Sequence, residues 1–294
     1  LQLLDRGIKL PLTMGHEIVG EVVAVGPDAS GAKAGDRRLV YPWIGCGTCN
    51  VCKAGDEQLC SAPKFLGVFA HGGYSDHVLV PHPRYLLDLE GIAPERAAPL
   101  ACSGVTTYGA LKKLGPMLQR EPVVIIGAGG LGLMCLALAN AMGSPGAILV
   151  DIDPAKRDAA MKAGAMAVVD GNAPDAAKQL ASLGRGAWSV VDLVGSSQTV
   201  RLGIDCLAKG GRLVVVGLFG GDVTISTPLL PLKALTIQGS YVGSLAELKE
   251  LIALVKRAGL PNVPLGMRKL ADADTALSEL RAGKVIGRLV LTPN

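Results

Sequence analysis

Charged and aromatic residues are scarce in this chain of 294 residues. Only 18% of the residues are charged and 3% are aromatic, and the net charge is +4. No block of five or more like charges occurs, which excludes the basic tails that bind nucleic acid. We therefore expect no nucleic-acid partner.

The chain also lacks a recognisable secretion signal, and it begins with Leu1 rather than Met, which suggests a trimmed or incomplete chain. Residues 122–150 carry no charge and are numerous enough to span a membrane. Gly127, Gly129, Gly130 and Gly132 interrupt them, however, so a strand, a turn and a buried helix explain them better. We expect a cytoplasmic protein without a membrane partner.

Apolar residues and glycine are abundant. Apolar residues make up 49% of the chain and glycine occurs 39 times, a composition that favours a compact α/β protein. Residues 1 to about 104 are β-rich, with β-branched runs at 18–25 and 74–80. From about 105, apolar strands alternate with helices, which predicts a parallel sheet covered on both faces. The expected strands are 123–126, 147–150, 168–169, 190–194, 212–217, 235–239 and a final one at 285–291. The expected helices are 131–142, 154–163, 197–207 and 244–258, the last with Ser244 and Glu247 as a capping box.

A glycine-rich turn follows the first of these apolar strands. Such a turn lets the backbone approach a pyrophosphate at the N-terminus of the next helix. Asp151 ends the following strand, where a carboxylate accepts hydrogen bonds from ribose hydroxyls and repels a 2′-phosphate. The pattern therefore predicts NAD rather than NADP. The basic residues Lys156 and Arg157, which lie just beyond Asp151, slightly weaken this preference for NAD. The residues of this fingerprint are Gly127, Gly129, Gly130, Leu131 and Gly132.

Four of the seven cysteines lie close together in the sequence, with spacings of three, three and eight: Cys46, Cys49, Cys52 and Cys60. Four thiolates can complete a tetrahedral shell around Zn²⁺, which makes a structural site without room for substrate. An iron–sulfur cluster is a chemical alternative, and free or disulfide-linked cysteines are another. The remaining three are Cys102, Cys135 and Cys206, which in isolation resemble ordinary buried thiols.

The order of these motifs resembles the zinc-dependent medium-chain alcohol dehydrogenases. The resemblance rests on Gly15-His16-Glu17, the four-cysteine loop, Cys102 before residues 104–108, the glycine fingerprint and Asp151. It extends over essentially the whole chain, because residues 239–243 and 287–288 also match. It implies an α/β plus β fold. A Rossmann NAD-binding domain would comprise residues 105–242. A GroES-like catalytic domain would comprise residues 1–104 and 243–294.

The resemblance also implies roles for individual residues. His16 and Cys102 would be ligands of a catalytic zinc, and Glu17 a carboxylate that can approach the metal. Trp43 falls where the family lines its substrate pocket, and a core aromatic is an equally good interpretation. The residues implied to bind the cofactor, besides the fingerprint and Asp151, are Thr106, Val194, Val216 and Leu218 near the nicotinamide, Lys156 near the ribose and Arg288 at the pyrophosphate.

One departure from the family pattern concerns the N-terminus. The family's remaining zinc ligand is a cysteine upstream of the Gly-His-Glu motif, yet no cysteine precedes His16. We therefore expect that an upstream segment is missing, that the catalytic zinc is poorly held and that turnover is impaired.

The function implied by the resemblance is hydride transfer between a primary or secondary alcohol and NAD, with an aldehyde or ketone in the reverse direction. The interdomain cleft would hold the substrate, and the protein would form a homodimer or homotetramer. Two alternatives stay open: an NADPH-dependent quinone or enoyl reductase relative, and a zinc-stabilised NAD-binding module without catalytic activity.

Overall fold

The computed structural model describes residues 8–89, 91–183 and 186–293. The chain forms two compact units. Unit 1 comprises Leu1–Val105, Val242–Leu260 and Pro264–Asn294, and unit 2 comprises Thr106–Tyr241 and Pro261–Val263. Each unit has its own sheets, which are described separately.

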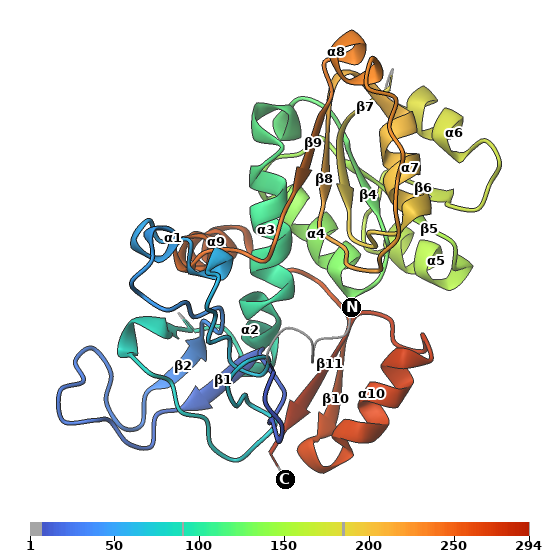
Figure 1. Ribbon diagram of the computed structural model, residues 1–294. Helices are drawn as coiled ribbons and strands as arrows, with labels where there is room; N and C mark the ends of the chain where they lie inside the picture. Colours follow the sequence, from blue (N-terminus) through green and yellow to red (C-terminus); the bar gives the residue numbers. More distant parts are fainter. Residues whose placement is uncertain (1–7, 90, 184–185, 294) are drawn as a thin grey trace. The chain divides into compact units, whose positions relative to one another are not determined.

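Unit 2 is built on a six-stranded parallel sheet with the order β6-β5-β4-β7-β8-β9 (Figure 1). Its strands are β4 (Val123–Ile126), β5 (Ala147–Asp151), β6 (Ala167–Asp170), β7 (Ala187–Asp192), β8 (Leu207–Val215) and β9 (Thr236–Gly239). The chain thus runs outward from β4 to one edge and then returns to build the other half, which is the strand order of dinucleotide-binding folds. This order places a switch point between β4 and β7.

Helices lie on both sides of this sheet (Figure 1). They are α3 (Ser103–Lys112), α4 (Gly130–Ala141), α5 (Pro154–Lys162), α6 (Ala176–Ser182), α7 (Ser197–Cys206) and α8 (Leu229–Lys233), with a 3₁₀ turn at Gly115–Gln119. All four residues of β4 are buried, as expected for a central strand covered on both faces. Val124 lies opposite Ile148 on one side and Val190 on the other, so the apolar strands meet in register at the core.

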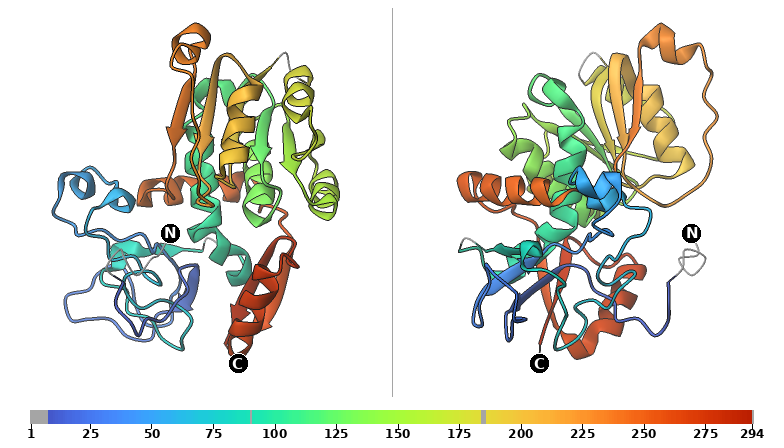
Figure 2. Two further views of the ribbon diagram at one scale, coloured as in Figure 1. Left: turned by 45° about the vertical axis from the view of Figure 1, so that its right-hand side comes forward. Right: turned by 60° about the vertical axis from the view of Figure 1, so that its left-hand side comes forward.

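Unit 1 contains a three-stranded antiparallel sheet of β1 (Ile18–Glu21), β2 (Arg37–Val40) and β3 (Leu86–Asp88). A second, parallel pair consists of β10 (Leu265–Lys269) and β11 (Arg288–Thr292), and α10 (Ala273–Arg281) connects them (Figure 2). The other helices are α1 (Asn50–Lys53), α2 (Pro94–Ala97) and α9 (Leu245–Ala258), with 3₁₀ turns η2 (Glu57–Leu59), η3 (Pro83–Tyr85), η4 (Ala98–Ala101) and η6 (Leu270–Asp272).

The sequence-based elements agree closely with the structure in unit 2. The uncharged stretch 122–150 forms β4, the glycine turn, α4 and β5, and no helix among the described residues is long and apolar enough to cross a membrane. The expected helix 244–258 is α9, and its capping box is present: Ser244 Oγ accepts from the Glu247 N–H, and the Glu247 carboxylate accepts from the Ser244 N–H. This reciprocal pair satisfies two helix-end donors.

The two β-branched runs of unit 1 form fewer strand residues than their sequence predicted. Residues 74–80 form no strand in the described part of the chain. Gly73 and Tyr74 donate their N–H groups to Gly15 and Met14, but no regular ladder follows. The run at 18–25 forms a strand only over β1. The chain turns after Val22, whose N–H donates to the Asp36 carbonyl, and the side chains of Val23 and Val25 are exposed. A strand requires a partner at each step, and β-branched side chains alone do not supply one.

Candidate functional site

The glycine turn of unit 2 has the geometry expected of a phosphate-binding loop. Gly127 has φ +99°, a conformation that favours glycine, and a Cβ on Gly132 would lie 2.0 Å from the Gly127 carbonyl oxygen. A Cβ on Gly129 would meet only open space, so this side of the turn is accessible. Gly129 is the N-cap of α4, and no side chain caps it. Gly130 and Leu131 follow as the first residues of α4, so the helix end presents free N–H groups to an anion.

Asp151 lies at the C-terminal end of β5, beside this turn. Its Oδ2 accepts from the Ala128 N–H at 2.8 Å and its Oδ1 from the Asp153 N–H at 2.9 Å. Each carboxylate oxygen can accept a further bond. The side chain therefore supports the turn and remains able to bind ribose hydroxyls.

The two basic residues after Asp151 differ in their surroundings. Arg157 donates to the Asp151 carbonyl at 2.8 Å and pairs with Asp170 at 3.4 Å, so its guanidinium is already engaged. Lys156 is half-buried at the start of α5. Of the two, only Lys156 remains a candidate cofactor ligand, and its role stays a prediction.

The residues predicted to line the nicotinamide pocket lie near the C-terminal ends of strands or in α3. Val194 follows β7, and Val216 follows β8 and is buried. Thr106 lies in α3, and its buried Oγ1 has no partner among the described residues. Such an orphan hydroxyl fits a ligand that completes its hydrogen bonding. Leu218 is 67% exposed and contacts little within unit 2.

The four-cysteine loop of unit 1 brings its thiols together as a metal centre would. The sulfur atoms of Cys46, Cys49, Cys52 and Cys60 all lie within 4.8 Å of one another. Cys49 Sγ lies 3.4 Å from Cys52 Sγ and 3.9 Å from Cys60 Sγ. The edge of a tetrahedron with Zn–S bonds of about 2.3 Å is about 3.8 Å, so the donor set fits Zn²⁺. This is the only group of three or more such side chains found in the described residues.

The thiols of this loop have unequal acidities in the absence of an ion. Hydrogen bonds, first of all from the Thr48 hydroxyl, lower the pKa of Cys46 to about 5. Burial raises the pKa of Cys52 to about 12. Backbone N–H groups of Cys46 and Ala62 also donate to Cys60 Sγ, each at 3.3 Å. Donors directed at sulfur stabilise thiolates, which is the form that binds metal.

His16 lies just before β1 in an aromatic environment. Its ring centroid is 5.1 Å from that of Trp43, whose Nε1 donates to the Ala101 carbonyl at 2.9 Å. Burial lowers the pKa of His16, so the imidazole is neutral near pH 7 and can offer a lone pair to a metal. Trp43 is 4% exposed and packs on Phe65, so it is both a core aromatic and a neighbour of His16.

Glu17 is held by Arg288, the first residue of β11. The Arg288 guanidinium donates to Glu17 Oε2, and the Ser103 N–H donates to Oε1 at 3.2 Å. Burial acts to lower the pKa of Arg288, but the charge and hydrogen bond of Glu17 raise it, and Cys102 adds to that rise. Besides burial, Glu17 and Arg288 both affect the pKa of His16. His16, Glu17, Cys102 and Arg288 thus form one electrostatic cluster in unit 1. The pyrophosphate role of Arg288 stays a prediction, because here it faces Glu17.

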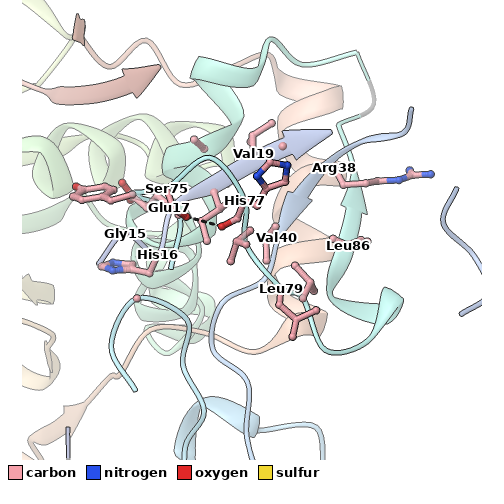
Figure 3. A pocket seen from close by; sticks show the side chains of 18 of the residues that line it. Gly15, His16, Glu17, Val19, Arg38, Val40, Ser75, His77, Leu79 and Leu86 are labelled. Atoms are coloured by element: carbon pink, nitrogen blue, oxygen red, sulfur yellow. Dashed lines mark hydrogen bonds between the residues drawn. The ribbon is translucent and has the colours of Figure 1, made fainter. Parts of the chain in front are cut away.

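A cavity of about 1690 Å³ adjoins this cluster (Figure 3). Its lining includes His16, Glu17 and Arg288, and most of the surrounding side chains are apolar, such as Leu79 and Leu289. An apolar lining with a few polar groups is what small-molecule sites share, although this cavity is larger than the roughly 300–1,000 Å³ usual for them.

Two buried carboxylates of functional interest were not predicted from the sequence. Glu57, inside the cysteine loop, is buried with Tyr85 and Arg84 as partners, although its sequence neighbours suggest a surface acid. Asp192, at the end of β7, is fully buried, and its Oδ1 accepts from the Val194 and Gly195 N–H groups. Asp192, like Asp151, stands at the C-terminal end of an apolar strand, but no glycine fingerprint accompanies it to indicate a function.

Comparison with known proteins agrees with these two units. Residues 2–91 match the family model of the alcohol dehydrogenase GroES-like domain, and residues 130–257 match that of the zinc-binding dehydrogenases. An NAD-dependent alcohol dehydrogenase of Sulfurisphaera tokodaii is 38% identical over 98% of this chain and 84% of its own length. The D-arabinose 1-dehydrogenase (NADP(+)) of Saccharolobus solfataricus is 32% identical over 98% of this chain and 83% of its own length. The crystal structure of the Aeropyrum pernix alcohol dehydrogenase superposes with a TM-score of 0.89 at 34% identity, covering 98% of this chain and 84% of that one.

A nucleotide-binding turn on a parallel sheet and a four-thiolate metal loop define a zinc-containing dinucleotide-dependent oxidoreductase. The chain belongs to the zinc-dependent medium-chain alcohol dehydrogenase family. This confirms the resemblance predicted from the sequence, the Rossmann and GroES-like fold class, and an enzyme of the alcohol dehydrogenase type with zinc in its cysteine loop. The zinc-free reductase alternative is disfavoured by the same matches.

Proposed function

We propose that this protein transfers hydride between a primary or secondary alcohol and NAD. The observation that carries the proposal is the cluster of His16, Glu17, Cys102 and Arg288 beside an apolar cavity in unit 1. Zinc, when bound, supplies Lewis-acid chemistry to the alcohol oxygen, and NAD accepts the hydride.

His16 and Cys102 are the residues that we propose hold the catalytic zinc. A neutral imidazole and a thiolate are both ligands that zinc favours. Arg288 would stabilise the thiolate of Cys102, and its ion pair holds the Glu17 carboxylate in place. Glu17 is thereby positioned to approach the metal or to release it as the alcohol enters. The apolar lining of the cavity would exclude water from the reacting oxygen.

In unit 2, the glycine turn and the N-terminus of α4 would bind the pyrophosphate of NAD. Asp151 would bind the adenosine ribose and select against a 2′-phosphate, in line with the NAD-dependent relatives. Thr106 Oγ1 would gain its missing partner from the bound cofactor or substrate.

Oligomeric state and compartment are proposed from an edge strand and from the cysteine loop. β9 lies at an edge of the six-stranded sheet, and an edge strand left unpaired favours association. A homodimer or homotetramer, as the family resemblance implies, would cover it. Free thiols in the cysteine loop fit a reducing compartment, for which we propose the cytoplasm.

Formation of NADH from primary and secondary alcohols, followed by absorbance, tests the proposed reaction. We expect Cys102→Ser and His16→Ala each to lower kcat/KM by about 10³-fold, because zinc contributes several kcal/mol to such a step. Each variant should also lose bound zinc without disturbing the four-cysteine loop. His71→Ala, an exposed histidine of the same unit that does not line the cavity, is the matched control and should retain activity and zinc.

Isothermal titration with NAD, together with the assay, distinguishes the proposed enzyme from an NAD-binding module without catalytic activity. Because the zinc between His16 and Cys102 is expected to be poorly held, the assay is run with zinc in excess. A protein that binds NAD tightly and holds zinc in the cysteine loop, yet forms no NADH with any alcohol under these conditions, would be a binding module, and the enzymatic proposal would be wrong. Activity that survives both Cys102→Ser and His16→Ala would reject the proposed metal ligands.

A further inference from the structure

Glu57 is an acidic side chain buried within the four-cysteine loop. It is 5% exposed, and both carboxylate oxygens have close partners. Oε2 accepts from the Gly45 N–H at 2.9 Å and from the Tyr85 hydroxyl at 2.7 Å, and Oε1 accepts from the Arg84 guanidinium at 2.9 Å. A buried carboxylate with three donors is a costly feature that persists only where its environment is well defined.

The partners of Glu57 connect both ends of the metal loop. Gly45 directly precedes Cys46, the first thiol, and the Glu57 carbonyl accepts from the N–H of Cys60, the last thiol, at 3.1 Å. There is little free space here, since a Cβ on Gly45 would lie 2.4 Å from Cys52 Sγ. The side chain of Glu57 thus fixes the first arm of the loop and its backbone fixes the last.

Arg84 and Tyr85 belong to η3 and anchor this arrangement outside the loop. The Arg84 guanidinium lies 4.6 Å from the centroid of the Tyr85 ring and pairs with Glu57. Arg84 also interacts electrostatically with Cys52. Four thiolates around Zn²⁺ carry a net charge of −2, so a nearby guanidinium offsets part of that charge.

We propose that Glu57 is a positioning residue of the structural zinc site, which holds the arms of the four-cysteine loop in the tetrahedral arrangement through Gly45 and Tyr85. Hydrogen-bonding partners outside the metal's own ligands commonly set how tightly the metal is held. This role is independent of the alcohol chemistry proposed above. The competing explanation is that Glu57 only ties the loop to the 3₁₀ turn η3 and contributes to folding without affecting the metal.

Zinc release from the purified protein distinguishes the two explanations. The protein is mixed with excess chelator and iodoacetamide without denaturant, and alkylation of Cys46, Cys49, Cys52 and Cys60 is followed by peptide mass. This readout identifies the metal loop and needs no catalytic activity. Buried Cys135 of unit 2 is the reference thiol, and Trp43 fluorescence in a Trp188→Phe background reports whether unit 1 stays folded.

We expect Glu57→Gln to accelerate alkylation of the four cysteines by about 10- to 100-fold while Trp43 fluorescence stays native. The amide cannot accept from all three donors and brings an extra N–H toward them. Tyr85→Phe, a milder change that removes one donor to a charged group, should accelerate it by about 10-fold. Glu21→Gln removes an exposed carboxylate paired with Arg37 at 3.9 Å and should leave the rate within about two-fold.

Native fluorescence with an unchanged alkylation rate in Glu57→Gln would overturn the proposal and leave only the folding role. If Glu57→Gln loses native fluorescence, the test relies on Tyr85→Phe instead. An unchanged alkylation rate in Tyr85→Phe would then overturn the proposal. A second readout is the charge-transfer spectrum of the cobalt-substituted loop. It should shift in Glu57→Gln if the sulfur geometry depends on the carboxylate, and a spectrum identical to that of the parent protein would also contradict the proposal.

Discussion

At the residue scale, Asp151 combines a structural and a binding function. Its carboxylate already holds the glycine turn through the Ala128 N–H, so a change affects both cofactor contact and turn geometry. We predict that Asp151→Asn weakens NAD binding by about 10- to 100-fold, the loss expected for a hydrogen bond to a charged group. The preference for NAD over NADP should fall as well, because the repulsive charge is gone.

Isothermal titration with both dinucleotides measures this effect. Asp158→Asn, which alters an exposed acid of α5, is the matched control and should leave both affinities unchanged. An Asp151→Asn protein that binds NAD as tightly as the parent would show that this carboxylate does not contact the ribose.

Asp151 was predictable from the sequence and Asp192 was not, although both end an apolar strand. The glycine fingerprint gave Asp151 its ligand-binding interpretation. Asp192 is 0% exposed, and its acceptors are used by the chain itself. The sequence does not reveal which way a side chain turns at the end of a strand, and that direction separates a ligand-binding acid from a structural one.

At the scale of elements, α7 begins with a cap that is linked to Asp192. Thr199 completes the capping box with Ser196 and donates its hydroxyl to Asp192 Oδ2 at 2.8 Å. We predict that Thr199→Val lowers the free energy of unfolding by about 3 kcal/mol, from the lost cap and the lost bond to a buried carboxylate. Urea denaturation measures it, and Thr224→Val at an exposed position should change stability little.

The same pair predicts a pH dependence. Burial raises the pKa of Asp192 above its ordinary value of 3.8, so the folded state holds this proton more tightly than the unfolded state. Its contribution to stability therefore falls as pH rises from the ordinary value through the raised one, and stays lower above it. Thr199→Val removes a donor to the charged form, so its cost should be larger at neutral pH than on the acid side of that window. An equal cost at both pH values would show that Asp192 does not respond to Thr199.

The elements of unit 2 that the sequence indicated were predictable because their apolar strands are bounded by turn residues and their helices by a cap or a glycine. α3, α6, α8, β10 and α10 were among the elements not identified. β10 reads Leu-Gly-Met-Arg-Lys and has no period that indicates a strand. It forms because β11 pairs with it in parallel, and each paired residue lies 23 positions further along the chain, a contact that local patterns cannot show. The converse error occurred at residues 74–80, where β-branched side chains alone suggested a strand.

At the scale of the whole molecule, unit 1 is assembled from three separate segments of the chain. Periodicity could not indicate this assembly, and the expectation that residues beyond 242 return to the first unit came from the family resemblance. The four-cysteine loop was predictable as a metal site from spacing alone. The buried Glu57 that supports it required the folded structure, because its partners Arg84 and Tyr85 lie far along the chain.

Zinc removal should therefore act on unit 1 first. Residues 46–60 contain only the short elements α1 and η2, so the thiolate–zinc bonds supply much of the energy that orders them. We predict that chelation accelerates tryptic cleavage after exposed Lys53 by at least about 10-fold, since cleavage follows the population of the open loop. Cleavage after Lys178 in α6 of unit 2, which has no part in the metal loop, is the internal reference and should stay constant. If both sites are cleaved faster in parallel, zinc stabilises the whole molecule; if neither changes, the loop is ordered by its own hydrogen bonds, and the structural role assigned to the metal is wrong.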